Sequence, residues 1–127
     1  MINYKVTALA DNLSTGETQY KYYPRICNRQ KLKLRELSKD ISRQCSLTET
    51  DVYGVLRTLI TNLPTLLLQN KSIELDEFGI FSLHAKVEGS ATAKEAKASK
   101  IKELKIAFRP HKYLKEGLLN AKFKKVK

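Results

Sequence analysis

Residues 73–83 read IELDEFGIFSL and contain the features that decide the fold. Apolar side chains alternate with other residues on both sides of the Phe78-Gly79 pair. A period of two is typical of strands that bury one face, and glycine allows the backbone to reverse or to bulge. The stretch therefore predicts two antiparallel strands joined by a tight turn, with Phe78 closing the end of the core.

Upstream of the turn, residues 32–45 (LKLRELSKDISRQC) predict a short amphipathic helix. Leu34, Leu37, Ile41 and Cys45 are three or four positions apart and therefore share one helix face. On that face we expect Cys45 to be a small core residue and not half of a disulfide.

A longer helix is predicted over residues 46–70, SLTETDVYGVLRTLITNLPTLLLQN. Thr48 followed by Asp51 resembles a capping box at its start, and Asn70 suits a left-handed cap at its end. Pro64 should bend the helix because it lacks a backbone donor. The apolar stripe is wider than the first helix can cover, so we expect it to be buried against a sheet or a second subunit.

Beyond the turn, the apolar pattern is lost from Ala85 to Ser99, which predicts a mobile, Lys-rich arm. It returns in IKELKIAF, residues 101–108, as a strand with an irregularity near Glu103 and an end at Arg109-Pro110. A C-terminal helix is predicted next. Its apolar positions are Tyr113, Leu114, Leu118 and Ala121, and Lys112, Lys115 and Lys122 lie on its wetter side.

The N-terminal segment predicts a separate β-hairpin from about Ile2 to Ile26. INYKVTAL and TQYKYYPRI have strand-like composition, and NLSTG between them has turn chemistry. Tyr20, Tyr22 and Tyr23 are interleaved with basic residues. They suit base stacking in a single-strand binder, although a strand that packs one tyrosine face on the core is the commoner outcome.

The charge is unevenly spread along the chain. Net +11 arises from 24 Lys and Arg against 13 Asp and Glu. Residues 1–31 carry five basic and two acidic groups, residues 32–85 six and seven, and residues 86–127 thirteen and four. Such an excess indicates a polyanionic partner, with nucleic acid ahead of an anionic membrane surface. We expect the middle to be scaffold and the last third to be the contact surface.

The order of these elements resembles the bacterial histone-like HU/IHF family. The resemblance covers residues 32–122 and rests on a helical ladder, on EFGIF at 77–81 and on AFRPHKYLKEGL at 107–118. The ladder comprises Leu37, Ile41, Cys45 and Leu47. The N-terminal segment, KYYPRI above all, is similar to a longer HU-related branch of Bacteroidetes-type bacteria.

The resemblance implies an α+β fold in which two helices form the base of an intertwined homodimer. An antiparallel sheet from each protomer builds a saddle, and two basic arms reach round DNA into the minor groove. Residues 1–31 would be an N-terminal extension and residues 32–127 the HU-like DNA-binding domain, with its arm at about 85–100. The expected dimer core consists of Val52, Leu56, Leu59, Ile60, Leu63, Phe78, Phe81 and Phe108.

DNA contacts are expected from the arm, from the returning strand and from the C-terminal helix. Lys105 and Arg109 should face phosphates, unless Arg109 pairs instead with Glu116 or with an acid of the turn. In HU-like proteins the backbone beside the turn glycine meets phosphate, which adds Gly79. The remaining expected contacts are Lys86, Lys94, Lys97, Lys100, Lys102, Lys112 and Lys115.

Two departures from the family pattern limit this transfer. Asp76 and Glu77 stand where family members are commonly apolar or glycine, and acids repel phosphate. The arm lacks the Arg-Asn-Pro tip whose proline wedges between base pairs, and it is shorter than in the better-known members. Sharp kinking by a proline wedge is therefore not expected here.

No motif of an enzyme, cofactor or metal site is recognised. His84 and His111 lie far apart without ligand-spaced neighbours, and no nucleophile elbow, P-loop or dinucleotide turn occurs. With two cysteines, no signal peptide and no transmembrane run, a cytoplasmic location is expected.

The sequence therefore predicts a nucleoid-associated homodimer that binds double-stranded DNA with little sequence preference and bends or compacts it. No cofactor, small-molecule substrate or membrane partner is expected. Two alternatives stay open, namely a non-catalytic protein-interaction module with weak DNA binding and an RNA or single-strand binder.

Overall fold

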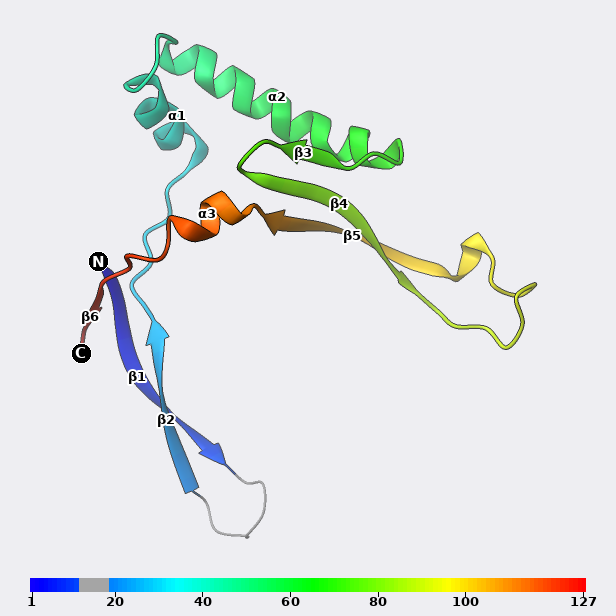
Figure 1. Cartoon of the computed structure of the whole chain (residues 1–127), viewed down its shortest axis with the longest axis horizontal. Coiled ribbons are helices and arrows are strands. Elements are labelled where there is room, and N and C mark those ends of the chain that lie inside the picture. The colour runs from blue at the N-terminus through cyan, green and yellow to red at the C-terminus, as the bar shows by residue number, and fades with distance from the viewer. Residues whose placement is uncertain (12–18) are drawn as a thin grey trace. The chain divides into compact units, whose positions relative to one another are not determined.

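The computed structural model describes residues 1–11 and 19–127, so the predicted NLSTG turn falls outside the described residues. The chain forms two compact units. Unit 1 comprises Met1–Leu32 and Leu118–Lys127, and unit 2 comprises Lys33–Gly117. The C-terminal ten residues, expected in one domain with the preceding helix, thus belong with the N-terminal segment (Figure 1).

Unit 2 begins with the two predicted helices, α1 (Leu34–Ser42) and α2 (Glu49–Leu68). The predicted caps of α2 are confirmed. The Thr48 side chain accepts a hydrogen bond of 3.2 Å from the Asp51 N–H, and Asn70 has a φ of 61° just beyond the helix. Pro64 lies inside α2, which continues to Leu68.

The contact between α1 and α2 contains few buried side chains. Ser38 is fully buried. Its hydroxyl donates a hydrogen bond of 2.7 Å to the Leu34 carbonyl, so the buried hydroxyl has a partner. Of the described apolar side chains, only Val52 and Leu67 are buried. The Arg35 guanidinium lies 4.5 Å from the centre of the Tyr53 ring and adds a cation–π contact.

The prediction that Cys45 is a core residue is wrong for this chain. Helix α1 ends at Ser42, so Cys45 lies beyond the helix whose apolar face it was expected to extend. Its side chain is exposed, and both cysteines are free thiols. The irregular segment between the helices releases it from the helical period.

Three antiparallel strands form the sheet of unit 2 in the order β3 (Ile73–Leu75), β4 (Gly79–Val87) and β5 (Ile101–Pro110). The Phe78 N–H donates 3.0 Å to the Leu75 carbonyl and closes the predicted turn. The His111 N–H donates 2.9 Å to the Phe78 carbonyl. EFGIF and FRPHKYL, distant in sequence, therefore meet at one end of this sheet.

Backbone conformation explains the glycine at this turn. Gly79 has a φ of 156° and is buried in the sheet, paired with Leu75 on one side and Pro110 on the other. A Cβ at this position would lie 2.5 Å from the Arg109 carbonyl oxygen and 2.7 Å from the Phe108 ring. Only glycine fits there without moving the β5 backbone.

Strands β4 and β5 continue beyond β3 as a two-stranded ribbon (Figure 1). The irregularity predicted near Glu103 is confirmed by a shift in register, because Lys86 pairs with Glu103 whereas Val87 pairs with Ile101. Part of the expected arm has regular secondary structure. Residues 85–87 belong to β4, and a short 3-10 turn, η1 (Ala98–Lys100), precedes β5.

The C-terminal helix is shorter than predicted. Helix α3 spans Lys112–Glu116, with the His111 Nδ1 atom accepting 3.1 Å from the Tyr113 N–H at its start. Gly117 follows as the C-cap, so Leu118, Ala121 and Lys122 lie outside the helix. The next residues form β6 (Phe123–Lys125), which the sequence did not predict because its partner strand lies at the other end of the chain.

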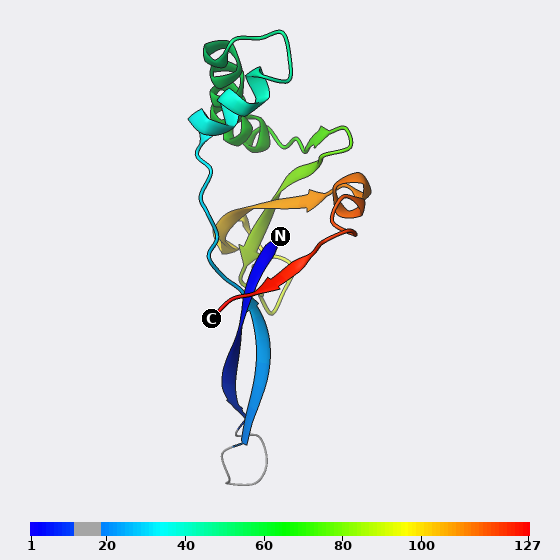
Figure 2. The ribbon, with the colours of Figure 1, turned by 90° about the vertical axis from the view of Figure 1, so that its left-hand side faces the viewer.

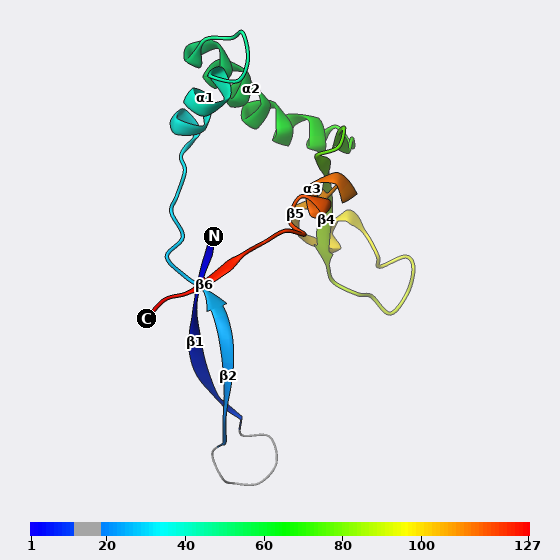
Figure 3. The same cartoon turned by 60° about the vertical axis from the view of Figure 1, so that its left-hand side comes forward.

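Unit 1 is a sheet of three strands in the order β2 (Gln19–Ile26), β1 (Ile2–Asp11) and β6. The predicted antiparallel pairing of β1 with β2 is confirmed, and the two strands twist around each other in Figure 2. Strand β6 runs parallel to the first residues of β1 (Figure 3). Bonds of 2.8 Å from Ile2 N–H to the Lys122 carbonyl and 2.9 Å from Val126 N–H to the Tyr4 carbonyl hold it there.

Candidate nucleic-acid interface

The β4–β5 register divides the ribbon into two chemically distinct faces. Ile80 pairs with Arg109, His84 with Lys105 and Lys86 with Glu103. Residues paired across an antiparallel ladder point to the same side, and every second residue shares that side. We call this side the polar face of the ribbon; its members are Ile80, Ser82, His84, Lys86, Glu103, Lys105, Ala107 and Arg109.

The opposite side is the apolar face of the ribbon. Its members are Phe81, Leu83, Ala85, Leu104, Ile106 and Phe108. At one end the ring centres of Phe81 and Phe108 lie 4.7 Å apart. The centre of the Phe78 ring lies 6.4 Å from that of Phe81 and 5.3 Å from that of Phe108. Ile106 is nevertheless 56% exposed and Leu104 51%. This face is therefore available to a further partner.

Lys105 and Arg109, predicted to face phosphates together, do share the polar face. The alternative pairing of Arg109 with Glu116 is not formed, because Glu116 instead lies 3.7 Å from Lys112. Within the described part of the chain, neither Lys105 nor Arg109 forms an ion pair. Both side chains are exposed and accessible to an anion.

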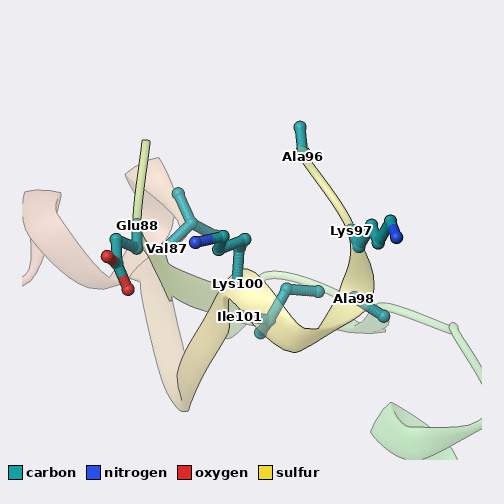
Figure 4. Close-up of a pocket in the computed structure, with 7 residues that line it drawn as sticks. All are labelled: Val87, Glu88, Ala96, Lys97, Ala98, Lys100 and Ile101. Atoms are coloured by element: carbon teal, nitrogen blue, oxygen red, sulfur yellow. The ribbon is translucent and has the colours of Figure 1, made fainter. Parts of the chain in front are cut away.

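The expected arm lysines are distributed around the end of the ribbon. Lys97 and Lys100 line a hollow of about 370 Å³ with Val87, Glu88 and Ile101, and Figure 4 shows the Lys97 side chain extending away from Glu88. The Lys102 ammonium lies 3.1 Å from the Glu88 carboxylate, with both side chains about half exposed. Lys102 is partly neutralised, whereas Lys94 and Lys97 are exposed at the tip.

The remaining expected contacts lie near the turn. Lys112 and Lys115 belong to the short helix α3, and Lys112 is already paired with Glu116. Gly79 is buried and offers little surface to a ligand, so its role in this chain is to let β4 and β5 approach each other. The acids beside it, Asp76 and Glu77, are both exposed.

His84 and Ser82 were not predicted as site residues. Their side chains lie 3.5 Å apart on the polar face, and His84 is directly opposite Lys105. They also line a hollow of about 550 Å³ with Arg109 and Ser72. The signal was present in the sequence, because positions 82, 84 and 86 alternate with the apolar positions 81, 83 and 85.

Most residues expected in a dimer core are still accessible in the single chain. Ile60 is 46% exposed, Phe78 45% and Phe108 39%, whereas Val52 is buried. Leu56, Leu59, Leu63 and Phe81 are half-buried.

Clustered metal ligands and membrane-spanning helices are absent from residues 1–11 and 19–127. No three His, Cys, Asp or Glu side chains in this part gather as metal ligands would. None of the described helices is long and apolar enough to cross a membrane.

Comparisons with solved structures find the same fold. HU of Anabaena, in a cocrystal with DNA, superposes with a TM-score of 0.55 at 17% identity and covers 71% of this chain and 100% of its own. A putative DNA-binding protein of Bacteroides vulgatus gives a TM-score of 0.63 at 8% identity over 98% of this chain. The chain spans 48% of that protein's length.

No curated protein matches the chain in sequence. A family model does match, over residues 1–125 and hence across both structural units. Its description is an HU domain fused to wHTH, Ig or a glycine-rich motif. By this match, the chain belongs to the HU-HIG family.

Proposed function

We propose that the protein is a homodimeric architectural protein that binds double-stranded DNA with little sequence preference and bends or compacts it. The polar face of the ribbon binds phosphates, and the arm enters a groove. Binding is driven by the release of counterions from the phosphates that the cations neutralise. The nucleoid in the cytoplasm is the proposed place of action, and no cofactor or reaction is involved.

The observation that carries the proposal is the separation of the two faces of the β4–β5 ribbon. Lys86, Lys105 and Arg109 lie on one face with His84, and the other face is wholly apolar. A ribbon built this way can rest its apolar side on protein and present its cations to a polyanion. The Anabaena HU protein with the same fold was crystallised with DNA, which makes DNA the favoured polyanion.

The homodimer is supported by the surface that the single chain leaves uncovered. A compact chain of 14.5 kDa exposes roughly 6,900 Å², and two separate globules of that total mass about 8,000 Å², whereas this chain exposes 11256 Å². The uncovered side chains are large and apolar, on helix α2 as well as on the ribbon. Apolar surface of this extent is typical of a subunit that folds with a partner.

The mode of binding follows from the side chains on the polar face. It contains one arginine and two lysines, and no Asn or Gln for paired bonds to an adenine edge. The arm likewise has lysines but neither arginine, Asn nor Gln. Lysine is a point charge that suits phosphates more than base edges. We therefore expect duplexes of unrelated sequence to bind with similar affinity.

The single-strand alternative is less well supported by the strand geometry. Tyr20 and Tyr22 alternate with Lys21 and therefore lie on the other side of their sheet from it. A stacking platform for single strands needs rings and cations on the same surface.

Lys105→Ala and Arg109→Ala provide the test, with Lys39→Ala on helix α1 as a control of equal charge. Affinity for several unrelated duplexes is measured across a series of salt concentrations. Each interface variant should lower the slope of log affinity against log salt by about one per lost phosphate contact, on every duplex. The control should keep the wild-type slope. Loss on one sequence only, with an unchanged slope, would mean that these residues read bases.

A further inference from the structure

We propose that the sheet of unit 1 carries a second phosphate-binding surface, with duplex DNA as its ligand. The choice of DNA rests on the proposed function, but the surface is separate from the ribbon. Unit 1 has nine Lys and Arg against two Asp and Glu, whereas unit 2 has fifteen against eleven. The smaller unit thus carries +7 of the total charge of +11.

Strand register places these cations on one side of the sheet. Lys5 pairs directly with Arg25, Thr7 with Tyr23, and Asn3 with Lys124 of β6. Paired residues point to the same side of a sheet. We call this side the basic face of unit 1; its members include Asn3, Lys5, Thr7, Leu9, Lys21, Tyr23, Arg25 and Lys124.

The other side of the same sheet is apolar and aromatic. It comprises Ile2, Tyr4, Val6, Ala8, Ala10, Tyr20, Tyr22, Pro24, Ile26 and Phe123, with Lys125 as its one charge. Tyr4, Pro24, Ile26 and Phe123 line a hollow of about 410 Å³ on it. The sheet is therefore amphipathic, and its cations are concentrated on one side and not scattered over the whole surface.

Three cations of the basic face, Lys5, Arg25 and Lys124, have no acidic partner among the residues that the structure describes. Like charges directly opposite each other destabilise an antiparallel pair, and Lys5 and Arg25 are placed in this way. Neither they nor Lys124 form an ion pair with any residue that the structure describes. All three are exposed. A row of phosphates would relieve their repulsion.

A duplex fits this surface better than a single strand. Two of the three exposed tyrosines of β2, Tyr20 and Tyr22, lie on the apolar side, so bases stacked on them would leave their phosphates away from the cations. The basic face has one ring, Tyr23, among several cations. Contact with the phosphate backbone of stacked, paired DNA requires only the cations.

Two neighbouring lysines of β6 allow a matched test in the full-length chain. Lys124 pairs with Asn3 on the basic face, and Lys125 pairs with Tyr4 on the apolar side. Lys124→Gln and Lys125→Gln remove the same charge one residue apart. Binding to duplex DNA, single-stranded DNA and single-stranded RNA is measured for each variant over a range of salt concentrations.

Lys124→Gln should lower the duplex slope by about one per lost contact and weaken binding roughly five- to tenfold at 0.1 M salt. Lys125→Gln should retain the wild-type slope. The double variant Lys5→Gln with Arg25→Gln should lower the duplex salt slope further. Thermal midpoints equal to that of the wild-type protein would exclude misfolding as the cause. Equal losses in the two β6 variants, or a loss on single strands alone, would overturn the proposal.

The ribbon variants keep this test apart from that of the proposed function. If Lys105→Ala lowers the duplex slope and Lys124→Gln does not, only the second surface is refuted. If the wild-type protein has no affinity for duplex DNA, the proposed function itself fails.

Discussion

At the scale of single residues, two positions of the turn between β3 and β4 are constrained for different reasons, one by space and one by backbone conformation. Gly79 must lack a side chain because β5 passes too close to it. Glu77, two residues earlier, has a φ of 62°, which costs a residue with a Cβ about 1 kcal/mol relative to glycine. Glycine therefore occupies position 79, where there is no space for a side chain. Position 77 has a left-handed backbone but is occupied by a glutamate.

Gly79→Ala should destabilise the protein by about 2–3 kcal/mol, because the new methyl group would collide with the β5 backbone. Gly89→Ala is the matched control, since a Cβ there meets no atom within 4 Å. Chemical denaturation of the two variants measures the difference. Equal stability of the variants would contradict the close approach of β4 and β5.

Glu77→Gly should stabilise the protein by about 0.5–1 kcal/mol by relieving the left-handed backbone strain. Glu77→Gln removes the charge but keeps the strain, so it should leave the free energy of unfolding nearly unchanged. Both substitutions remove an exposed acid near the proposed interface and should raise duplex affinity to a similar extent. A stability gain in both variants would assign the effect to charge and not to backbone conformation.

At the scale of elements, the sequence predicted those parts whose signals are local. The caps of α2 and the alternation around Phe78-Gly79 depend on residues a few positions apart, and both are confirmed. Strand β6 pairs with β1 across more than a hundred residues, and three residues hold no periodic signal. The end of α3 was missed for the same reason, since the chain leaves the helix to form that pairing.

The candidate interface was predictable in part, because the alternation of residues along a strand assigns each residue to one face of the β4–β5 ribbon. Lys105 and Arg109 were placed on one surface correctly, whereas His84 was not predicted although the same alternation places it there. The concentration of charge on unit 1 was not predictable. The last third of the chain was expected to form one contact surface, but its last four lysines belong to unit 1 because the C-terminal strand pairs with β1.

Shortening the arm tests whether it binds DNA or supports the fold. The Glu88 N–H donates 2.9 Å to the Lys100 carbonyl, so an Asn-Gly turn can replace residues 89–99 without breaking the ribbon. The thermal midpoint should change little, since the segment contributes no buried apolar side chain. Duplex affinity should fall and its salt slope decrease, because Lys94 and Lys97 are removed. An unfolded variant would mean that the arm is structural.

At the scale of the whole molecule, the uncovered apolar surface predicts an obligate dimer. Sedimentation at micromolar concentration should give about twice 14.5 kDa. Ile60→Asp should dissociate and unfold the protein, because it places a charge on the exposed apolar side of α2. The neighbouring surface substitution Thr61→Asp is the control. A well-folded wild-type monomer would refute the homodimer.

The most direct test of the central claim is a binding titration of the wild-type protein on several unrelated duplexes and on single-stranded DNA at a series of salt concentrations. Log affinity for duplexes should fall linearly with log salt, with one steep slope for all sequences and affinities that differ little between them. Single strands should bind more weakly at every salt concentration. A shallow slope, a marked preference for one sequence or tighter binding to single strands would contradict an architectural protein that holds duplex DNA through its phosphates.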